Sequence, residues 1–267
     1  MPELPEVESI ARSLAAGGLV GRRVQRARVG WARTIAAPSA RAFASRVQGQ
    51  RVTGVGRRGK FVKIDLDRDK LLIHLRMSGD LLLGESLKPL GSHSRMELYF
   101  EDGAQLCFND PRKFGRVWLV EETDAVLGAL GPEPFDTVLT PKRFYEMLHP
   151  RKRQLKPLLL DQAFLAGLGN IYADEALWEG RLHPLRPASR VNRKQAAALL
   201  AGIRKVLKAG IKGNGASIDW VYQGGEFQNY FRVYQRTGEK CPRCGAKIKR
   251  MVLGQRGTHY CPKCQIR

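Results

Sequence analysis

Apolar residues near the start of the chain recur at the spacing of one helix face. They fall at i, i+3, i+4 and i+7, at Val7, Ile10, Ala11 and Leu14. Pro5 suits a first helical position, because the N–H that proline lacks would have no partner there. The pattern therefore predicts an N-terminal helix that ends before Gly17-Gly18, with Pro2 and Glu3 just ahead of its first turn.

The period then changes to that of short strands. Apolar residues alternate with Lys63 and Asp65, as in a half-buried strand. Strands are predicted at residues 62–66, 71–75, 96–100, 104–108 and 117–120. Asp102-Gly103 predicts a hairpin turn between two of them. Residues 1–125 are thus expected to form a mostly antiparallel β-sandwich or barrel that carries one N-terminal helix.

Beyond the Pro/Gly-rich segment at residues 131–134, the period is helical. Helices are predicted at residues 141–148, 155 to about 165, 170–178 and from Asn192 to a stop at Gly210. Asn192 and Gln195 match a capping box. The apolar face of the last helix is Ala196, Leu199, Leu200, Ile203, Val206 and Leu207. Its lysines and arginines suit either a solvated face or phosphate contacts.

The change of period predicts an α+β, multidomain chain. We expect a β-sandwich domain at residues 1–125, a helical domain at 131–222 and a cysteine-rich module at 235–267. Residues 213–229 are rich in glycine and have no clear period, so they predict a mobile loop.

The charge of the chain narrows its partners. Lys+Arg number 46 against 25 Asp+Glu, which gives a net charge of +21 and a pI near 10.3. Such an excess, spread along the chain, favours a polyanionic partner, although ribosomal proteins and RNA binders share it. There is no long uncharged apolar stretch and no secretory layout at the N-terminus, so we expect an intracellular protein.

Four of the five cysteines fall in the last 27 residues. Cys241, Cys244, Cys261 and Cys264 form C-x2-C-x16-C-x2-C, the spacing of a zinc ribbon. The pattern predicts one structural Zn²⁺ in a closed tetrahedral site, and a redox pair is the alternative. Cys107 stands alone in an apolar run and is expected to be a buried hydrophobic residue.

Removal of Met1 would expose the secondary amine of Pro2. An α-amino group has a pKa near ~8, so part of it is neutral and nucleophilic at physiological pH. Attack on an aldehyde-like carbon would give an iminium that remains cationic and acts as an electron sink. The alternative is that Pro2 and Glu3 only begin a helix. If Met1 were retained, Pro2 would be an inert tertiary amide.

Several short motifs, in order along almost the whole chain, resemble the bacterial formamidopyrimidine-DNA glycosylase family (Fpg/Nei). They are Pro2-Glu3-Leu4-Pro5-Glu6-Val7-Glu8, Arg58-Gly59-Lys60-Phe61, Met77-Ser78-Gly79, Asp110-Pro111-Arg112-Lys113-Phe114-Gly115, Gly169-Asn170-Ile171-Tyr172-Ala173 and the four C-terminal cysteines. Leu4-Pro5 resembles this branch rather than the endonuclease VIII branch, which usually has Gly-Pro there.

The resemblance implies an N-terminal β-sandwich, a helix-two-turns-helix domain and a zinc finger. It also implies a monomeric bifunctional glycosylase/lyase of base excision repair that acts on double-stranded DNA. The implied lesions are 8-oxoguanine opposite cytosine, formamidopyrimidines and abasic sites, with strand cleavage by β,δ-elimination. Such a protein is expected in the bacterial cytoplasm, associated with the nucleoid through DNA.

The resemblance also implies roles for individual residues. Pro2 matches the nucleophile and Glu3 the acid/base residue that protonates the opening sugar oxygen. Lys60 matches the catalytic lysine, and Arg256 a phosphate ligand and acid for the last elimination. Without the resemblance, Lys60 would be read as a surface lysine at a strand edge and Arg256 as an exposed cation in a hairpin.

Further residues match positions that contact DNA. Met77, Arg112 and Phe114 match the residues that fill the gap left by an extruded nucleotide, and Met77 and Phe114 would otherwise be read as core residues. The remaining DNA-contacting matches are His93, Arg151, Lys156 and Asn170. The chain departs from the family at Gly213-Asn214-Gly215-Ala216-Ser217, before the loop that caps the lesion, which leaves lesion preference open.

Two other functions remain open on the sequence. One is an endonuclease VIII-like glycosylase for oxidised pyrimidines. The other is a non-catalytic relative that binds damaged DNA.

Overall fold

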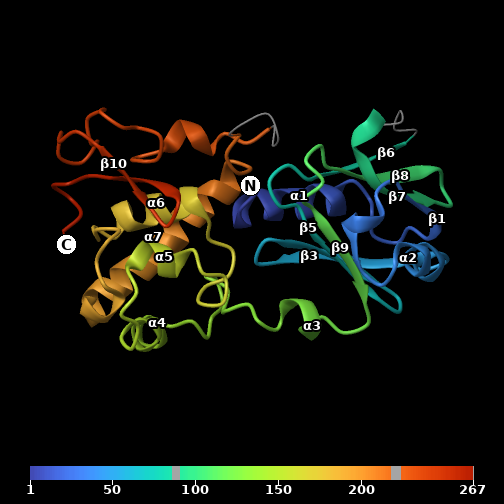
Figure 1. Cartoon of the computed structure of the whole chain (residues 1–267), viewed down its shortest axis with the longest axis horizontal. Helices are drawn as coiled ribbons and strands as arrows, with labels where there is room; N and C mark the ends of the chain where they lie inside the picture. Colours follow the sequence, from blue (N-terminus) through green and yellow to red (C-terminus); the bar gives the residue numbers. More distant parts are fainter. Residues whose placement is uncertain (86–90, 218–223, 267) are drawn as a thin grey trace. The chain divides into compact units, whose positions relative to one another are not determined.

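The computed structural model describes the whole chain except residues 86–90, 218–223 and 267 (Figure 1). The chain forms two compact units. The first comprises Met1–Gly128 and Ser217–Gly225, and the second comprises Ala129–Ala216 and Glu226–Arg267. The predicted α+β architecture is confirmed.

The first unit contains two β-sheets. One is fully antiparallel and is formed, in spatial order, by β1 (Val24–Val29), β7 (Ser94–Phe100), β8 (Ala104–Asn109) and β6 (Asp80–Glu85). The other is formed by β2 (Ile35–Ala37), β9 (Arg116–Val120), β5 (Lys70–His74), β4 (Phe61–Leu66) and β3 (Val52–Arg58), in which only the β2–β9 pair is parallel. All five predicted strands are present, and β7 and β8 form the predicted hairpin.

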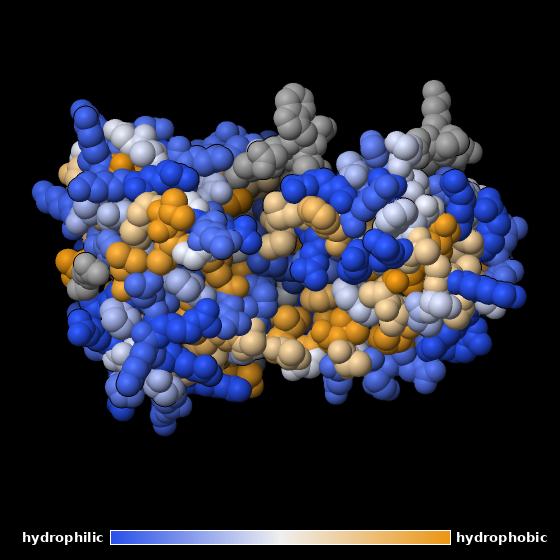
Figure 2. Space-filling model, in the orientation of Figure 1, coloured by the Kyte–Doolittle hydropathy of each residue, from blue (hydrophilic) through white to orange (hydrophobic). Residues whose placement is uncertain are grey.

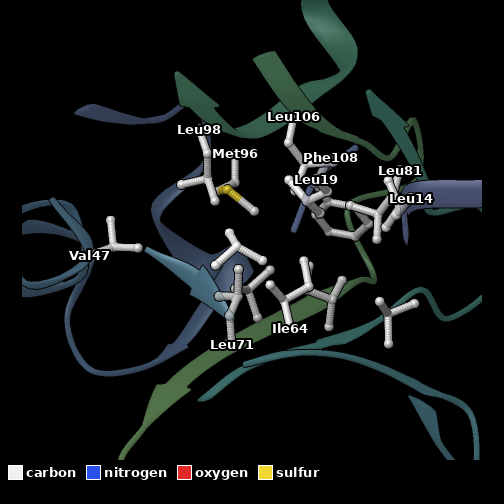
Figure 3. Packing of buried hydrophobic residues seen from close by; sticks show 14 of the residues in the cluster. Leu14, Leu19, Val47, Ile64, Leu71, Leu81, Met96, Leu98, Leu106 and Phe108 are labelled. Carbon is white, nitrogen blue, oxygen red and sulfur yellow. The ribbon is translucent and has the colours of Figure 1, made fainter. Parts of the chain in front are cut away.

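The core of this unit lies between the two sheets. Figure 3 shows Leu98, Leu106 and Phe108 of one sheet directed toward Ile64 and Leu71 of the other. These side chains are at most 1% exposed. Burying each contributes roughly 1.5–3 kcal/mol. The alternation read from the sequence therefore identifies the face of each strand that packs inward.

Helix α1 (Leu4–Ala16) begins and ends as predicted. Glu3 is its N-cap residue, and the Glu3 amide donates to Glu6 Oε2 over 2.8 Å. Its predicted apolar face is buried, and Gly17 caps its C-terminus. Pro2 and Glu3 therefore lie just ahead of the first turn, and both are buried.

The apolar pattern does not predict several elements of this unit. They are β1, β2, β3, β6, α2 (Ala40–Val47), α3 (Asp124–Leu127) and the 3-10 turns η1 (Ala32–Thr34) and η2 (Gly91–His93). β1 is an edge strand that carries Arg26 and Arg28, and β3 contains Gly54 and Gly56. Pairing with neighbouring strands, rather than local propensity, makes these segments extended.

The second unit is helical, with a small hairpin at its C-terminal end. Its elements are α4 (Pro141–Leu148), α5 (Leu155–Leu159), α6 (Asn170–Glu179), η3 (Ala188–Arg190), α7 (Arg193–Lys212), η4 (Phe227–Tyr230), β10 (Lys249–Leu253) and β11 (Arg256–Tyr260). The predicted limits of α4 are confirmed. α5 is shorter than predicted, because the Gln162 side chain binds the Gly167 amide and the Leu168 carbonyl and thereby holds the following residues in a loop.

Helix α7 has the predicted cap and apolar face, but the predicted stop at Gly210 is wrong. The helix continues to Lys212, and Gly213 is the capping residue. Gly210 is present for packing, because a Cβ atom there would lie 2.5 Å from Cε1 of the buried Tyr172 on α6. Glycine inside a helix usually costs stability, and here it allows the close approach of a ring.

Two cations of α7 are used within the unit. Arg204 donates to the carbonyls of Pro134, Asp136 and Leu139, and Lys205 Nζ lies 2.5 Å from Glu179 Oε1. Arg204 thus binds the chain around the helix, whereas Lys205 remains exposed, as do Arg193, Lys194 and Lys208. Part of the predicted mobile loop, residues 218–223, lies outside the described residues.

Hydrophilic residues cover much of the face seen in Figure 2, and apolar residues appear in smaller groups among them. Among the described residues, no helix is both long enough and apolar enough to cross a bilayer.

The contact between Gly210 and Tyr172 predicts a reversal of the usual effect of replacing glycine by alanine in a helix. We expect Gly210→Ala to lower the free energy of unfolding by about 1–3 kcal/mol through overpacking, measured by urea denaturation. Gly56→Ala is the matched control, since a Cβ atom there meets nothing within 4 Å. Equal or greater stability of Gly210→Ala would contradict this account of α7.

Candidate active site and metal centre

The start of α1 lies against the end of strand β3. α1 packs on β3 and β4, and Arg57 Nε donates to Glu8 Oε2 over 2.8 Å. Arg57 is one residue from the end of β3, and the turn into β4 holds Gly59 and Lys60. Gly59 has φ +56°, a left-handed conformation that favours glycine. Lys60 is only 5% exposed, so the alternative of a surface lysine is wrong.

His74 lies beside Lys60 and was not among the predicted site residues. Its ring meets the Phe61 ring edge-on, with centroids 4.7 Å apart, and its Nδ1 accepts the Arg76 amide over 3.0 Å. Burial, followed by the charges of Arg76 and Lys60, lowers the pKa of His74 to about 3. The imidazole is therefore neutral at physiological pH. The one sequence signal was a polar residue that interrupts the apolar run at residues 71–75.

The turn at Met77-Ser78-Gly79, called the Met77 turn below, and the loop at residues 110–115 are joined by one buried carboxylate. Asp110 is 0% exposed, and its side chain accepts the Ser78 hydroxyl, the Arg112 amide over 3.2 Å and the Gly115 amide over 2.7 Å. The Arg112 amide also lies 3.3 Å from Ser78 Oγ. The structure thus brings together two motifs that are more than 30 residues apart in the chain.

Phe108 explains the glycines of these two motifs. A Cβ atom on Gly79 would lie 2.7 Å from Phe108 Cε2, and one on Gly115 would lie 2.3 Å from Phe108 Cζ. Neither distance is compatible with a side chain at these positions. Both loops therefore close over the same buried ring.

The side chains that these loops carry reach solvent. Phe114 is 49% exposed, and the Arg112 guanidinium lies 5.0 Å from the centre of its ring. Met77 is half-buried, and His93 in η2 is exposed. Phe114 is thus not a core residue, which was the alternative reading. An exposed phenyl ring beside a guanidinium suits stacking on a base and donation to its edge.

In the second unit, Lys156 occupies a different environment from that expected for a phosphate contact. Its side chain is 0% exposed, and Nζ lies 2.6 Å from Asp174 Oδ1 and 2.9 Å from the Gly257 carbonyl oxygen. Asn170 Nδ2, at the first residue of α6, donates to the same carbonyl over 3.1 Å. Both residues therefore bind the hairpin that carries Arg256.

Two adjacent carboxylates of α6 hold the C-terminal module. Asp174 accepts the His259 amide over 2.8 Å. Glu175 accepts the amides of Arg232, Val233 and Tyr234 over 2.8–3.1 Å, and burial raises its pKa. Arg256, the first residue of β11, is exposed next to the tethered Gly257. Arg151 is also exposed, and its carbonyl accepts the Ser189 amide.

The four C-terminal cysteines form a metal centre. Their Sγ atoms all lie within 4.8 Å of one another. Tetrahedral Zn²⁺ with bonds of about 2.3 Å needs sulfurs roughly 3.8 Å apart. The Cys241–Cys264 and Cys244–Cys261 separations are 3.9 and 3.4 Å, so the donor set fits one zinc ion.

The surroundings of these thiols also suit a bound cation. Trp178 Nε1 lies 3.4 Å from Cys241 Sγ, and the Cys264 amide lies 3.4 Å from Cys261 Sγ. Burial, followed by the hydrogen bond with Cys244, raises the pKa of Cys264, while the pKa of Cys241 is lowered to about 6. A bound divalent ion would favour the thiolate form of all four ligands. Cys107 is 1% exposed and burial raises its pKa, as expected for an unreactive thiol.

Three family models match the chain in order. The N-terminal domain of formamidopyrimidine-DNA glycosylase matches residues 1–117, its H2TH domain matches residues 130–221, and a zinc finger found in FPG and IleRS matches residues 238–266.

Proteins named formamidopyrimidine-DNA glycosylase match the chain over nearly their full length. The formamidopyrimidine-DNA glycosylase of Roseiflexus sp. is 45% identical over 99% of this chain and 100% of its own, and that of Protochlamydia amoebophila is 42% identical over 99% of each. The structure of Lactococcus lactis Fpg with DNA containing an abasic site gives a TM-score of 0.92 at 34% identity, covering 99% of this chain and 100% of that one. MutM with DNA containing carbocyclic 8-oxo-G gives 0.90 at 35% identity, covering 100% of both.

The metal centre predicts that stability of the C-terminal module depends on zinc. We expect Cys244→Ser, or chelation of the metal, to unfold residues 238–266 and to weaken DNA binding, because a structural zinc site contributes folding energy. Hydrogen exchange measures the first effect and duplex titration the second. Cys107→Ser is the control and should change neither. Normal affinity of metal-free protein would contradict the prediction.

The environment of His74 predicts that it stays neutral over a wide pH range. Its pKa of about 3 lies below the ordinary value of 6.5, so the neutral ring stabilises the fold fully above pH ~6.5, and this contribution is lost as the pH falls toward 3. We expect the His74 imidazole NMR signal, assigned with His74→Asn, not to titrate between pH 5 and 8. A His74 midpoint near 6.5 would show that the ring is solvated.

Proposed function

Because the chain belongs to the formamidopyrimidine-DNA glycosylase family, we propose that it removes 8-oxoguanine opposite cytosine and formamidopyrimidines from duplex DNA and then cleaves the strand. The family acts in base excision repair as DNA glycosylases with abasic-site lyase activity. The observation that carries the proposal for this chain is the buried Pro2-Glu3 pair at the start of a helix that packs on the strands flanking the buried Lys60.

Pro2 is the proposed nucleophile, after removal of Met1. An enzyme that acts on a base first takes the nucleotide out of the stack. The Pro2 nitrogen then forms a bond to C1′ of the sugar while the bond from C1′ to the base breaks. The departing base takes up the proton that the Pro2 nitrogen loses. Glu3 protonates the ring oxygen as the sugar opens, which leaves an iminium on Pro2. Glu3 suits this role because its backbone is fixed by Glu6 and its side chain is buried.

Strand cleavage follows from the iminium. The positive nitrogen makes the C2′ proton acidic, and its removal expels the phosphate at C3′ in a β-elimination. A second elimination expels the phosphate at C5′, and hydrolysis releases Pro2. We propose Lys60 as the acid for the first elimination and as a phosphate contact. Arg256 is the proposed phosphate ligand and acid for the second.

The exposed side chains on the two loops joined by Asp110 are the proposed DNA wedge. Met77 and Phe114 would fill the space left by the extruded nucleotide, and the Arg112 guanidinium would donate to the orphaned cytosine. His93, Arg151 and Asn170 are proposed phosphate contacts. The burial of Lys156 supports an indirect part, in which it holds Gly257 and therefore the neighbouring Arg256.

The remaining proposals concern organisation. We propose three domains at residues 1–125, 131–222 and 235–267, and the ranges matched by the family models support them. The zinc ion is structural, since four cysteines close its coordination and leave no position for chemistry. The protein is proposed to act as a monomer and to associate with the bacterial nucleoid through DNA.

The lesion is tested by comparing duplexes that contain 8-oxoguanine or thymine glycol in the same sequence. We expect faster release of 8-oxoguanine opposite cytosine, measured under single-turnover conditions. Faster release of thymine glycol would favour the endonuclease VIII-like alternative. Binding of both duplexes without release of either base would favour a non-catalytic damage-binding protein.

The nucleophile is tested by blocking the amine without changing any side chain. A two-residue extension before Pro2 turns its nitrogen into an amide, which has no nucleophilic lone pair. We expect the extended protein to bind duplex DNA normally, to release no base and to give no adduct on borohydride reduction with abasic DNA. The control is the same preparation after proteolytic removal of the extension, which should recover both activities. Trapping by the extended protein would refute the role of Pro2.

A further inference from the structure

Arg95 lies at a bulge in β7, where the strand meets the loops of the proposed wedge. Ser94 pairs with Asn109 and Met96 with Phe108, so Arg95 is an additional residue in its strand. A bulge of this kind redirects a side chain and is frequent beside active sites. The bulge therefore directs the Arg95 side chain to the end of the sheet, where it meets both the turn before β7 and the loop after β8.

The Arg95 guanidinium binds backbone carbonyls on both of these segments. Nε donates to the Asp110 carbonyl over 2.7 Å, and Nη1 donates to the Ser92 carbonyl over 2.6 Å. Nη2 lies 3.4 Å from His93 Nδ1 and 3.5 Å from the Pro111 carbonyl. The side chain is 5% exposed. A buried planar fork with donors in fixed directions holds these two segments at a defined separation.

A third loop is attached through the Arg95 backbone. Its carbonyl accepts the amides of Gly30 and Trp31 over 2.9 and 3.3 Å. The Trp31 ring in turn lies 4.3 Å from Lys113 Nζ, on the 110–115 loop. Gly30 permits the approach, because a Cβ atom there would lie 2.5 Å from the Ser94 carbonyl oxygen. One residue thus connects three loops that surround the proposed wedge.

We infer that Arg95 is a positioning residue for the opposite-strand contacts of Arg112 and Phe114. Its fork fixes the backbone of Asp110, and the Asp110 carboxylate fixes the amides of Arg112 and Gly115 on either side of Phe114. This inference rests on the wedge role proposed above for Arg112 and Phe114. Arg95 itself contacts no base and takes part in no proton transfer.

The consequence is a separation of two activities. Excision from a duplex requires the wedge, because the extruded base leaves a gap and an orphaned partner. Formation of the iminium on a single-stranded abasic oligonucleotide requires the Pro2 amine but no wedge. Loss of Arg95 should therefore impair the first reaction and preserve the second. It should also reduce discrimination between cytosine and adenine opposite the lesion, because Arg112 reads that base.

The test compares Arg95→Met and Arg95→Lys with a matched variant, Arg46→Met. Arg46 is a partly buried arginine of the same unit, and it pairs with Asp69 and Glu121 rather than with any of these three loops. The measurements are single-turnover release of 8-oxoguanine opposite cytosine and opposite adenine, and borohydride trapping on single-stranded abasic DNA. Thermal unfolding of each variant accompanies them.

We expect Arg95→Met to lower release from the duplex by about ten-fold or more, since small displacements of positioning groups have effects of this size. The preference for cytosine over adenine should narrow, while trapping on single-stranded DNA stays within about two-fold of Arg46→Met. Arg95→Lys should recover only part of the loss, because an ammonium lacks the planar fork.

Two results would overturn the inference. One is duplex release by Arg95→Met equal to that of Arg46→Met, and the other is a parallel loss of duplex release and single-strand trapping. Arg112→Ala, measured in the same assay, shows whether the positioning role of Arg95 or the wedge role of Arg112 is the part that is wrong. If Arg112→Ala discriminates between the opposite bases normally, the wedge role is wrong and the inference falls with it. If only Arg112→Ala is impaired, the inference about Arg95 alone is wrong.

Discussion

A buried carboxylate must be surrounded by donors, and this requirement organises the functional loops of the protein. Asp110 is fully buried and is satisfied by the Ser78 hydroxyl from the other motif and by two backbone amides of its own loop. Leaving any buried polar partner unsatisfied costs roughly 1–3 kcal/mol, more when the group is charged. The Met77 turn and the 110–115 loop therefore cannot separate without exposing or orphaning this group. The exposed side chains proposed as the wedge, Arg112 and Phe114, are therefore carried by a backbone that this carboxylate holds in place.

In the second unit, two buried carboxylates on one helix are satisfied in the same way, by donors from other segments. Asp174 and Glu175 follow one another on α6, and between them they bind Lys156, the His259 amide and three consecutive amides at residues 232–234. The cysteine module is small and has a limited core of its own, so metal and these hydrogen bonds supply what apolar burial does not. Its hairpin is thereby held where Lys156 and Asn170 meet the Gly257 carbonyl.

The positively charged side chains of this protein fall into two groups, one that is used inside the fold and one that is exposed. The net charge of +21 indicates an anionic partner, but several of the cations are used internally. Arg95 and Arg204 bind carbonyls, and Lys156 pairs with Asp174. The exposed Arg112, Arg151 and Arg256 remain directed to solvent. Composition alone does not separate these groups, because the difference between them is burial, which depends on the surrounding fold.

The amino-acid sequence by itself determined the period of each long element, the limits of α1 and α4, the zinc-binding spacing and the order of the family motifs. These are local properties, set by neighbouring residues and by turn and cap chemistry. Only the tertiary structure decided that Gly210 lies inside a helix against Tyr172, that edge strand β1 is a strand, and that Lys156 is buried. It also brought His74 to Lys60 and Arg95 to Asp110. Each of these depends on a contact between residues distant in the chain, and one sequence carries no period or spacing that reports such a contact.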